Sequence, residues 1–233
     1  KLTIKATTAI DETGSKVLPE PVDIFIEDGF IKSISPTGIV APEGRVIDGT
    51  NTLTSPGLIN GHHHSHENFH KGRYDRLPLE LWMNFVRPAK GIPLTPDDVY
   101  LRTLIGASQA LLSGTTCIVD DFNASPILSK EHLEAAFAAY EDIGIRALVG
   151  PTLFDVPFHE SVPYLTEECD VDLLSAFKPK KATPISEYMD LLESLTNSRH
   201  PHTNRVGIIM APSAPQRCSD RLLMQVREFA DQH

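Results

Sequence analysis

The sequence predicts an α/β fold in which a short β-rich segment precedes the first half of a (β/α)8 barrel. Apolar and polar residues alternate near the N-terminus, short apolar runs begin after residue 54, and helical patterns lie between those runs. Strand and helix alternate four times, which fits half of a barrel or a four-stranded open sheet. A complete barrel takes about 250 residues, more than this 233-residue chain offers after its β segment.

The N-terminal segment, residues 1–54, is expected to form a small β-sandwich or meander. Val22, Ile24 and Ile26 fall at alternate positions, and an Asp28-Gly29 pair follows them before the apolar residues of 30–34. An Asp-Gly pair between two such runs predicts a hairpin with a type I′ turn, because glycine adopts the required positive φ at little cost.

Four buried strands are expected after that segment, at residues 52–60, 115–122, 146–154 and 206–211. These runs are short and apolar, without clean alternation. Such a pattern is typical of strands that are buried on both faces, as in a parallel sheet.

Helices are expected between the strands because start and stop signals flank each periodic pattern. Thr95 can cap the first and Gly114 end it, Ser129 and Gly144 bound the second, and Ser219 can cap the last. A further helix is expected at residues 185–196. Two apolar stripes stand out: Leu101, Leu104, Ile105, Ser108, Leu111 and Leu112, and then Leu133, Ala136, Phe137 and Tyr140.

A long irregular insertion follows the third predicted strand, at residues 156–183. On a barrel it would lie at the C-terminal face, where active sites form. Two interpretations are left open for this insertion: a lid over the active site, or a mobile surface segment without a role.

Composition narrows the class of partner. A net charge of −10 argues against a nucleic-acid partner, and no apolar run is long enough to span a membrane. The three cysteines show neither zinc-finger spacing nor a disulfide framework, which favours a reducing, cytoplasmic location. We therefore expect a small-molecule substrate and, for the full-length protein, a homo-oligomer.

The most informative stretch is residues 55–66, where an apolar strand runs into three consecutive histidines. Because strand side chains alternate, His62 and His64 are expected to point the same way and His63 the opposite way. Two imidazoles on one side of a strand end can hold a divalent metal ion. The alternative is a surface histidine cluster without a role.

The chain resembles the amidohydrolase superfamily along nearly its whole length. The carrying motif is Pro-Gly-Leu-Ile-Asn-x-His-x-His at residues 56–64. It looks most like the aminohydrolase and chlorohydrolase branch, which includes S-adenosylhomocysteine, guanine and cytosine deaminases and triazine hydrolases. Further matching positions are Lys71-Gly72, residues 77–79 (Leu-Pro-Leu), Trp82, residues 114–116 (Gly-Thr-Thr) with Asp120, and residues 211–215 with Cys218-Ser219.

The resemblance favours the truncated barrel over the open sheet. It implies that residues 1–54 are the N-terminal part of an accessory β-sandwich and that residues 55–233 are the first four β/α units of the barrel. It also implies one divalent metal ion, zinc or alternatively iron, held by His62 and His64. The family's other ligands and its proton-shuttling Glu belong to later strands, so the catalytic acid and base are expected beyond the chain end, and the chain alone is expected to be inactive.

The implied activity is hydrolysis of a non-peptide carbon–nitrogen bond, namely deamination of a cyclic amidine or nitrogen heterocycle by a metal-activated water. Two departures weaken an adenosine-type substrate: Ser213 replaces the family's fourth-strand His, and residues 88–91 carry no carboxylate. The fourth strand also ends without the Lys that two-metal relatives carboxylate. The alternative function is a catalytically inactive fragment or an α/β binding domain.

Other polar and aromatic residues near the motif are weaker candidates. His66 and His70, in the loop after the strand, are expected either to contact substrate or to be solvated. Trp82 is expected to wall the pocket or to pack its helix, and Ser213 to contact substrate. A last pair, Asp120 and Asp121, is a candidate for supporting the ligands or closing the barrel.

Overall fold

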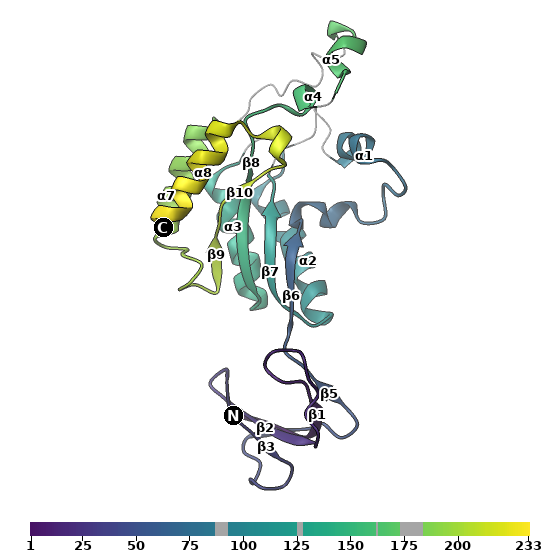
Figure 1. Ribbon diagram of the computed structural model, residues 1–233, viewed down its shortest axis with the longest axis vertical. Coiled ribbons are helices and arrows are strands. Elements are labelled where there is room, and N and C mark those ends of the chain that lie inside the picture. The colour runs from purple at the N-terminus through teal and green to yellow at the C-terminus, as the bar shows by residue number, and fades with distance from the viewer. Residues whose placement is uncertain (87–92, 125–127, 162, 173–183) are drawn as a thin grey trace. The chain divides into compact units, whose positions relative to one another are not determined.

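The computed structural model describes residues 1–86, 93–124, 128–161, 163–172 and 184–233 (Figure 1). The chain divides into two compact units, Lys1–Gly57 and Leu58–His233. Each unit has its own sheet and its own hydrophobic cluster. Residues 88–91 lie outside the described residues, as do residues 162 and 173–183 of the insertion at 156–183. The described part of that insertion is not wholly irregular, because it contains two short helices, Phe158–Ser161 and Leu165–Glu168.

The first unit is a small mixed sheet with the strand order β3-β2-β1-β4, and β5 also pairs with β1. Strand β1 is antiparallel to β2 and parallel to β4, and β2 is antiparallel to β3. The strands are β1 (Leu2–Ala9), β2 (Val22–Glu27), β3 (Phe30–Pro36), β4 (Arg45–Asp48) and β5 (Leu53–Thr54).

The predicted hairpin is confirmed between β2 and β3. Glu27 pairs with Phe30, and the two turn residues Asp28 and Gly29 have φ of 53° and 80°. Both central residues of a type I′ turn need positive φ, which Gly adopts freely and Asp tolerates.

The second unit is built on a parallel sheet with the order β10-β8-β7-β6, and β9 pairs with β8 (Figure 1). The predicted parallel sheet is therefore confirmed. Burial on both faces is wrong for the first predicted strand: Leu58 is 62% exposed and Ile59 is 70% exposed, because among the described strands β6 pairs only with β7 and is an edge strand of this sheet. Its strands are β6 (Leu58–His63), β7 (Thr115–Phe122), β8 (Arg146–Leu153), β9 (Val206–Ile208) and β10 (Ala211–Pro212).

Two predicted strands are interrupted. The run at residues 52–60 forms β5 in the first unit and β6 in the second, with residues 55–57 between them. Pro56 has no N–H to donate to a ladder, so the chain leaves the sheet there. The run at residues 206–211 is divided likewise into β9 and β10.

The predicted helices form with the expected caps. The Thr95 side chain and Asp98 make a capping box at the start of α2 (Pro96–Leu112). Ser129 caps α3 (Lys130–Ile143), and Gly144 ends it with φ of 80°. The remaining helices are η1 (Ser65–His70), α1 (Leu79–Val86), α4 (Phe158–Ser161), α5 (Leu165–Glu168), α7 (Ile185–Thr196), η2 (Pro215–Arg217) and α8 (Asp220–Gln232).

Helix α2 does not bury its apolar stripe in this chain. Leu101 and Ile105 are exposed, and Leu112 is 89% exposed. The buried residues lie on another face and are mostly small or polar: Val99, Arg102, Thr103, Gly106 and Ala107. That face packs against α3 and η1, and small residues permit the close approach.

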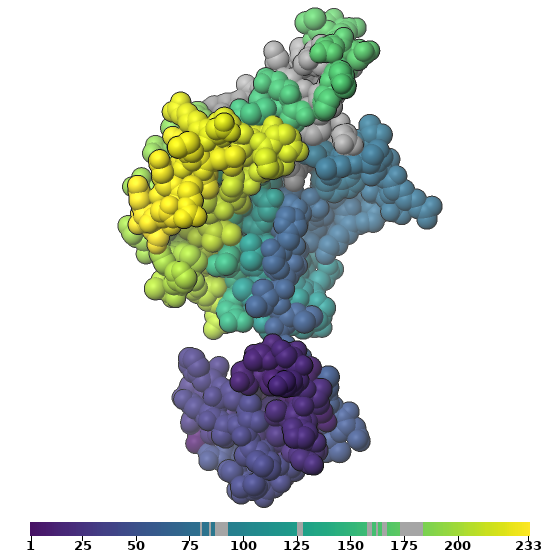
Figure 2. All heavy atoms as spheres, viewed as in Figure 1, coloured from purple at the N-terminus to yellow at the C-terminus, as the bar shows by residue number. Residues whose placement is uncertain are grey.

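The core of the second unit lies between the sheet and its helices. Phe122 on β7, Tyr140 on α3 and Leu153 on β8 are fully buried in it. Helices α7 and α8 also contribute. In Figure 2 the yellow atoms of the C-terminal residues, which include α8, cover one side of the second unit. No helix among the described residues is long and apolar enough to cross a membrane.

Candidate metal centre

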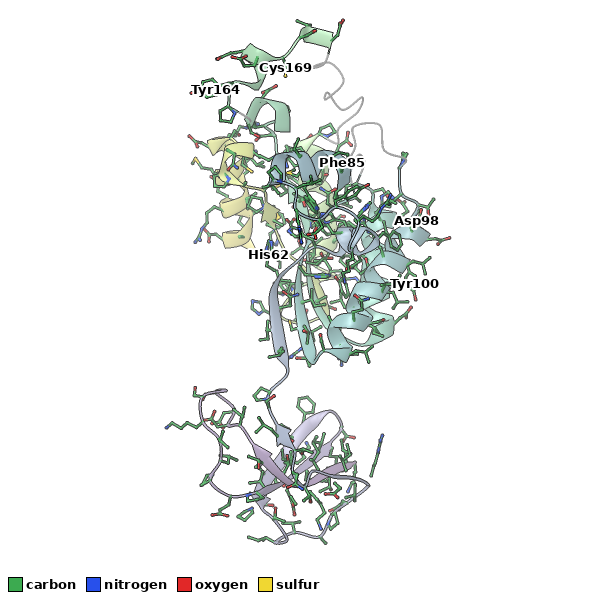
Figure 3. All side chains as sticks on the ribbon, turned by 90° about the vertical axis from the view of Figure 1, so that its right-hand side faces the viewer. His62, Phe85, Asp98, Tyr100, Tyr164 and Cys169 are labelled. Carbon is green, nitrogen blue, oxygen red and sulfur yellow. The ribbon has the colours of Figure 1, made fainter. Side chains whose placement is uncertain are left out.

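Strand β6 carries the histidines to the carboxyl edge of the parallel sheet. The strand pairs with β7, with His63 opposite Asp120. His62 is exposed at the end of β6 (Figure 3), whereas His63 and His64 are half-buried. The carboxyl ends of parallel strands are where α/β folds assemble their ligand sites.

The rings of His62 and His64 lie together, as the alternation along a strand predicts. Their Nε2 atoms are 3.0 Å apart, and the ring centroids are 4.6 Å apart. His64 Nδ1 lies 3.4 Å from the backbone oxygen of Asp121 and 3.6 Å from its Oδ2. Each nitrogen that faces the other ring is thus an Nε2, and His64 Nδ1 faces oxygen acceptors.

This geometry fits a shared metal ion. Nitrogens bound at about 2.0–2.1 Å to one tetrahedral zinc lie roughly 3.3 Å apart. The distance of 3.0 Å between the two Nε2 atoms is close to that separation. Imidazole nitrogen is also a donor that Zn²⁺ and Fe²⁺ both accept.

Helix η1 adds a second group of potential ligands. Ligand atoms of His64, His66 and Glu67 lie within 4.8 Å of one another. His66 is only 6% exposed, and its Nε2 is 3.4 Å from Glu67 Oε1. The structure therefore brings His66 to the histidine pair, with ring centroids of His64 and His66 5.1 Å apart.

A buried carboxylate supports the turn behind His64. Asp120 is fully buried; its Oδ1 accepts the Ser65 N–H at 2.9 Å and its Oδ2 accepts the Tyr140 hydroxyl at 2.9 Å. Burial, together with the charge of Asp120, raises the pKa of Tyr140 well above its usual value. Tyr140 therefore stays protonated and keeps donating to Asp120.

Three expected substrate contacts lie in different surroundings. His70, at the end of η1, is half-buried, and burial lowers its pKa; its ring is 6.2 Å from that of Tyr74. Trp82 is half-buried on α1. Ser213 follows β10, where its N–H donates to Leu153 O at 2.8 Å. This hydrogen bond from Ser213 therefore extends the pairing of β10 with β8.

Asn68 has a structural position. It is buried, and its Nδ2 donates to Arg102 O on α2 at 3.0 Å. The backbone of Gly106 passes directly beneath its amide. From the sequence, Asn68 is expected either to line the pocket or to be a solvated residue of the loop after the strand. Neither alternative includes its contact with α2, because nothing local reveals that contact.

Sequence reasoning also missed Thr152. Its hydroxyl donates to Asp121 Oδ1 at 2.6 Å, which links β8 to β7 at the edge that carries the histidines. The two consecutive aspartates were the available signal, since strand alternation turns them to opposite faces. The threonine partner could be found only from the register between β7 and β8.

Two described cavities lie elsewhere, with volumes of about 550 and 540 Å³. The first is lined by Asp155 and residues of α7 and α8, and the second by those helices and the adjoining β9–β10 region. The histidine pair contributes to neither of them.

Comparison with known proteins identifies relatives whose sequences are similar to most of this chain. A 5-methylthioadenosine/S-adenosylhomocysteine deaminase of Pyrococcus furiosus is 30% identical over 90% of this chain and 43% of its own length. A 5'-deoxyadenosine deaminase of Methanocaldococcus jannaschii is 32% identical over 91% of the chain and 43% of its length. The chain thus spans less than half the length of these curated relatives.

Solved structures share the fold. An atrazine chlorohydrolase from Arthrobacter aurescens, complexed with zinc, matches all of this chain and 51% of its own, with a TM-score of 0.81 and 21% identity. A zinc-bound adenosine deaminase from Xanthomonas campestris has a TM-score of 0.72 at 24% identity, over 99% of this chain and 47% of its own. The α/β fold of this chain therefore corresponds to about half of an amidohydrolase barrel structure.

A family model gives the assignment directly, because the amidohydrolase family model matches residues 53–233. That range includes the parallel sheet and all the histidines described above. The chain belongs to the amidohydrolase family.

Proposed function

We propose that this chain forms the part of a metal-dependent hydrolase that supplies His62 and His64 to one divalent metal ion, and that the whole protein removes an amino group from a nitrogen heterocycle. The observation that carries the proposal is the 3.0 Å separation of the two Nε2 atoms at the carboxyl edge of a parallel sheet. Zinc in related structures favours zinc over iron.

The protein's own residues have separate tasks. When bound, the metal ion supplies a water whose pKa is lowered to about 7, a nucleophile at neutral pH. His62 and His64 hold the ion through Nε2. His66 and Glu67 offer a buried nitrogen and a carboxylate beside the pair for polar groups of a substrate. His70 and Trp82 are proposed to line the same region from η1 and α1.

The substrate class is a small amino-substituted heterocycle. Relatives named as deaminases of adenine nucleosides support a purine or a related ring. Ser213, in place of the family's histidine, argues for a substrate that differs from those nucleosides beyond the reacting ring.

The remaining features of the whole protein are proposals as well. We assign residues 1–54 to an accessory β-sandwich and 55–233 to the first four units of the barrel. The three cysteines are free, which supports a reducing, cytoplasmic location. We propose that the full-length protein is a homo-oligomer.

The test is ammonia release by the zinc-loaded protein, expressed from its full natural coding sequence. The substrate panel contains 5'-deoxyadenosine, adenine, guanine, cytosine and an amino-triazine. We expect turnover of at least one, loss of that turnover in His62→Ala and His64→Ala, and retention in the matched control His202→Ala, which removes an exposed histidine from a loop. Undiminished turnover in His62→Ala would refute the proposal.

A further inference from the structure

Two consecutive aspartates at the end of β7 face opposite sides of the sheet. Asp120 is turned toward α3, where it accepts the Tyr140 hydroxyl. Asp121 is turned toward the histidines, and its Oδ2 lies 3.6 Å from His64 Nδ1. These two adjacent residues of β7 therefore contact the turn after β6 from opposite sides: Asp120 at Ser65 and Asp121 at His64.

Asp121 is itself held in place by the next strand. The buried Thr152 of β8 donates its hydroxyl to Asp121 Oδ1 at 2.6 Å. Because β7 and β8 are paired in register around this point, the two side chains come from a rigid part of the sheet. The chain of contacts runs from β8 through β7 to the histidine that follows β6.

The surroundings of His64 Nδ1 select one tautomer of the ring. Both protein atoms described near that nitrogen, Asp121 O at 3.4 Å and Asp121 Oδ2 at 3.6 Å, are acceptors. A neutral imidazole carries one proton, so a proton on Nδ1 leaves the lone pair on Nε2. That Nε2 is the atom 3.0 Å from His62 Nε2.

We propose that Asp121, fixed by Thr152, is a positioning residue that holds His64 with its proton on Nδ1 and its Nε2 free for the metal ion. The metal part of this inference rests on the proposed function; the tautomer part does not. A carboxylate behind a ligating histidine fixes the orientation of the ring and strengthens it as a ligand. Asp121 acts through His64 and contacts no reacting atom.

The test compares variants of the full-length protein in which one group changes at a time. Asp121→Asn keeps the shape but offers an amide N–H that can donate to His64 Nδ1, which favours the opposite tautomer. Thr152→Val removes the hydroxyl that holds Asp121. The matched control is Asp155→Asn: Asp155 also accepts a hydroxyl, that of Ser219 at 2.6 Å, at the end of β8.

The first readout is the ¹⁵N NMR signature of His64 in the metal-free protein, assigned by its loss in His64→Ala. We expect a protonated Nδ1 in the wild type and a shift toward protonated Nε2 in Asp121→Asn. A change in fold stability alone would not move this signature. An unchanged tautomer in Asp121→Asn overturns the proposal.

The second readout is zinc affinity, measured by competition with a chelator. We expect about 10–100-fold weaker binding in Asp121→Asn, a smaller loss in Thr152→Val and wild-type binding in Asp155→Asn. Equal affinity of wild type and Asp121→Asn counts against the positioning role. If His62→Ala and His64→Ala bind zinc as the wild type does, the proposed function fails, and the tautomer measurement still decides the role of Asp121.

Discussion

Replacing Gly106 with Ala should destabilise the second unit, although alanine is the better helix former. Gly106 lies inside α2, where its backbone touches the buried side chain of Asn68 on η1. A Cβ at Gly106 would lie 2.0 Å from Asn68 Nδ2 and 2.7 Å from its Cγ. The amide would have to move, and its hydrogen bond to Arg102 O would be lost with it.

The expected magnitude follows from three contributions. Overpacking costs about 1–3 kcal/mol. Stranding the buried amide costs about 1–3 kcal/mol. The gain in helix propensity offsets about 1 kcal/mol. The free energy of unfolding should therefore fall by about 1–5 kcal/mol.

The assay is urea unfolding of Gly106→Ala against wild type, with the shift of the midpoint read at constant slope. The matched control is the same substitution in an Asn68→Ala background. There the clash is absent, so Gly106→Ala should be neutral or should stabilise by up to about 1 kcal/mol. A neutral effect in the wild-type background would refute the reasoning that η1 is docked on α2 through this contact.

Three further outcomes are expected. Tyr140→Phe leaves Asp120 Oδ2 without its buried hydroxyl donor, so thermal or urea unfolding should show a loss of about 1–3 kcal/mol. Asp98, labelled in Figure 3, accepts hydrogen bonds from the Thr95 hydroxyl and N–H, and these bonds lower the pKa of Asp98. The stabilising effect of the ionised Asp98 is therefore present above the unfolded-state pKa and is lost as pH falls through the lower folded-state pKa. The Asp98→Asn variant should accordingly have a lower free energy of unfolding than the wild type at neutral pH, and the difference should shrink in acid. Unfolding followed by circular dichroism at several pH values measures both. Gly144→Ala should lose about 1 kcal/mol, because Gly144 ends α3 at φ of 80°.

Local patterns predicted those parts of the fold that local forces determine. The hairpin at Asp28-Gly29 and helix α3 both follow from turn and capping chemistry within a few residues. The face that α2 buries could not be predicted this way. Its apolar stripe is exposed, and Gly106 is buried because Asn68 reaches it from a distant part of the sequence.

In the candidate site, too, local patterns predicted some features and missed those that depend on contacts between distant segments. Strand alternation predicted that His62 and His64 would lie together, and their Nε2 atoms are 3.0 Å apart. The burial of His66 and the contact between Asp121 and Thr152 depend on how η1 and β8 pack beside β6, so no pattern within one segment reveals them.

The most direct measurement of the central claim is zinc stoichiometry of the full-length protein after dialysis, compared among His62→Ala, His64→Ala and His66→Ala. Two geometries compete: the pair of Nε2 atoms of His62 and His64, and the group of His64, His66 and Glu67. The account predicts one zinc per chain in the wild type, loss in His62→Ala and His64→Ala, and retention in His66→Ala. Retention in His62→Ala with loss in His66→Ala would contradict it and move the metal to the second group.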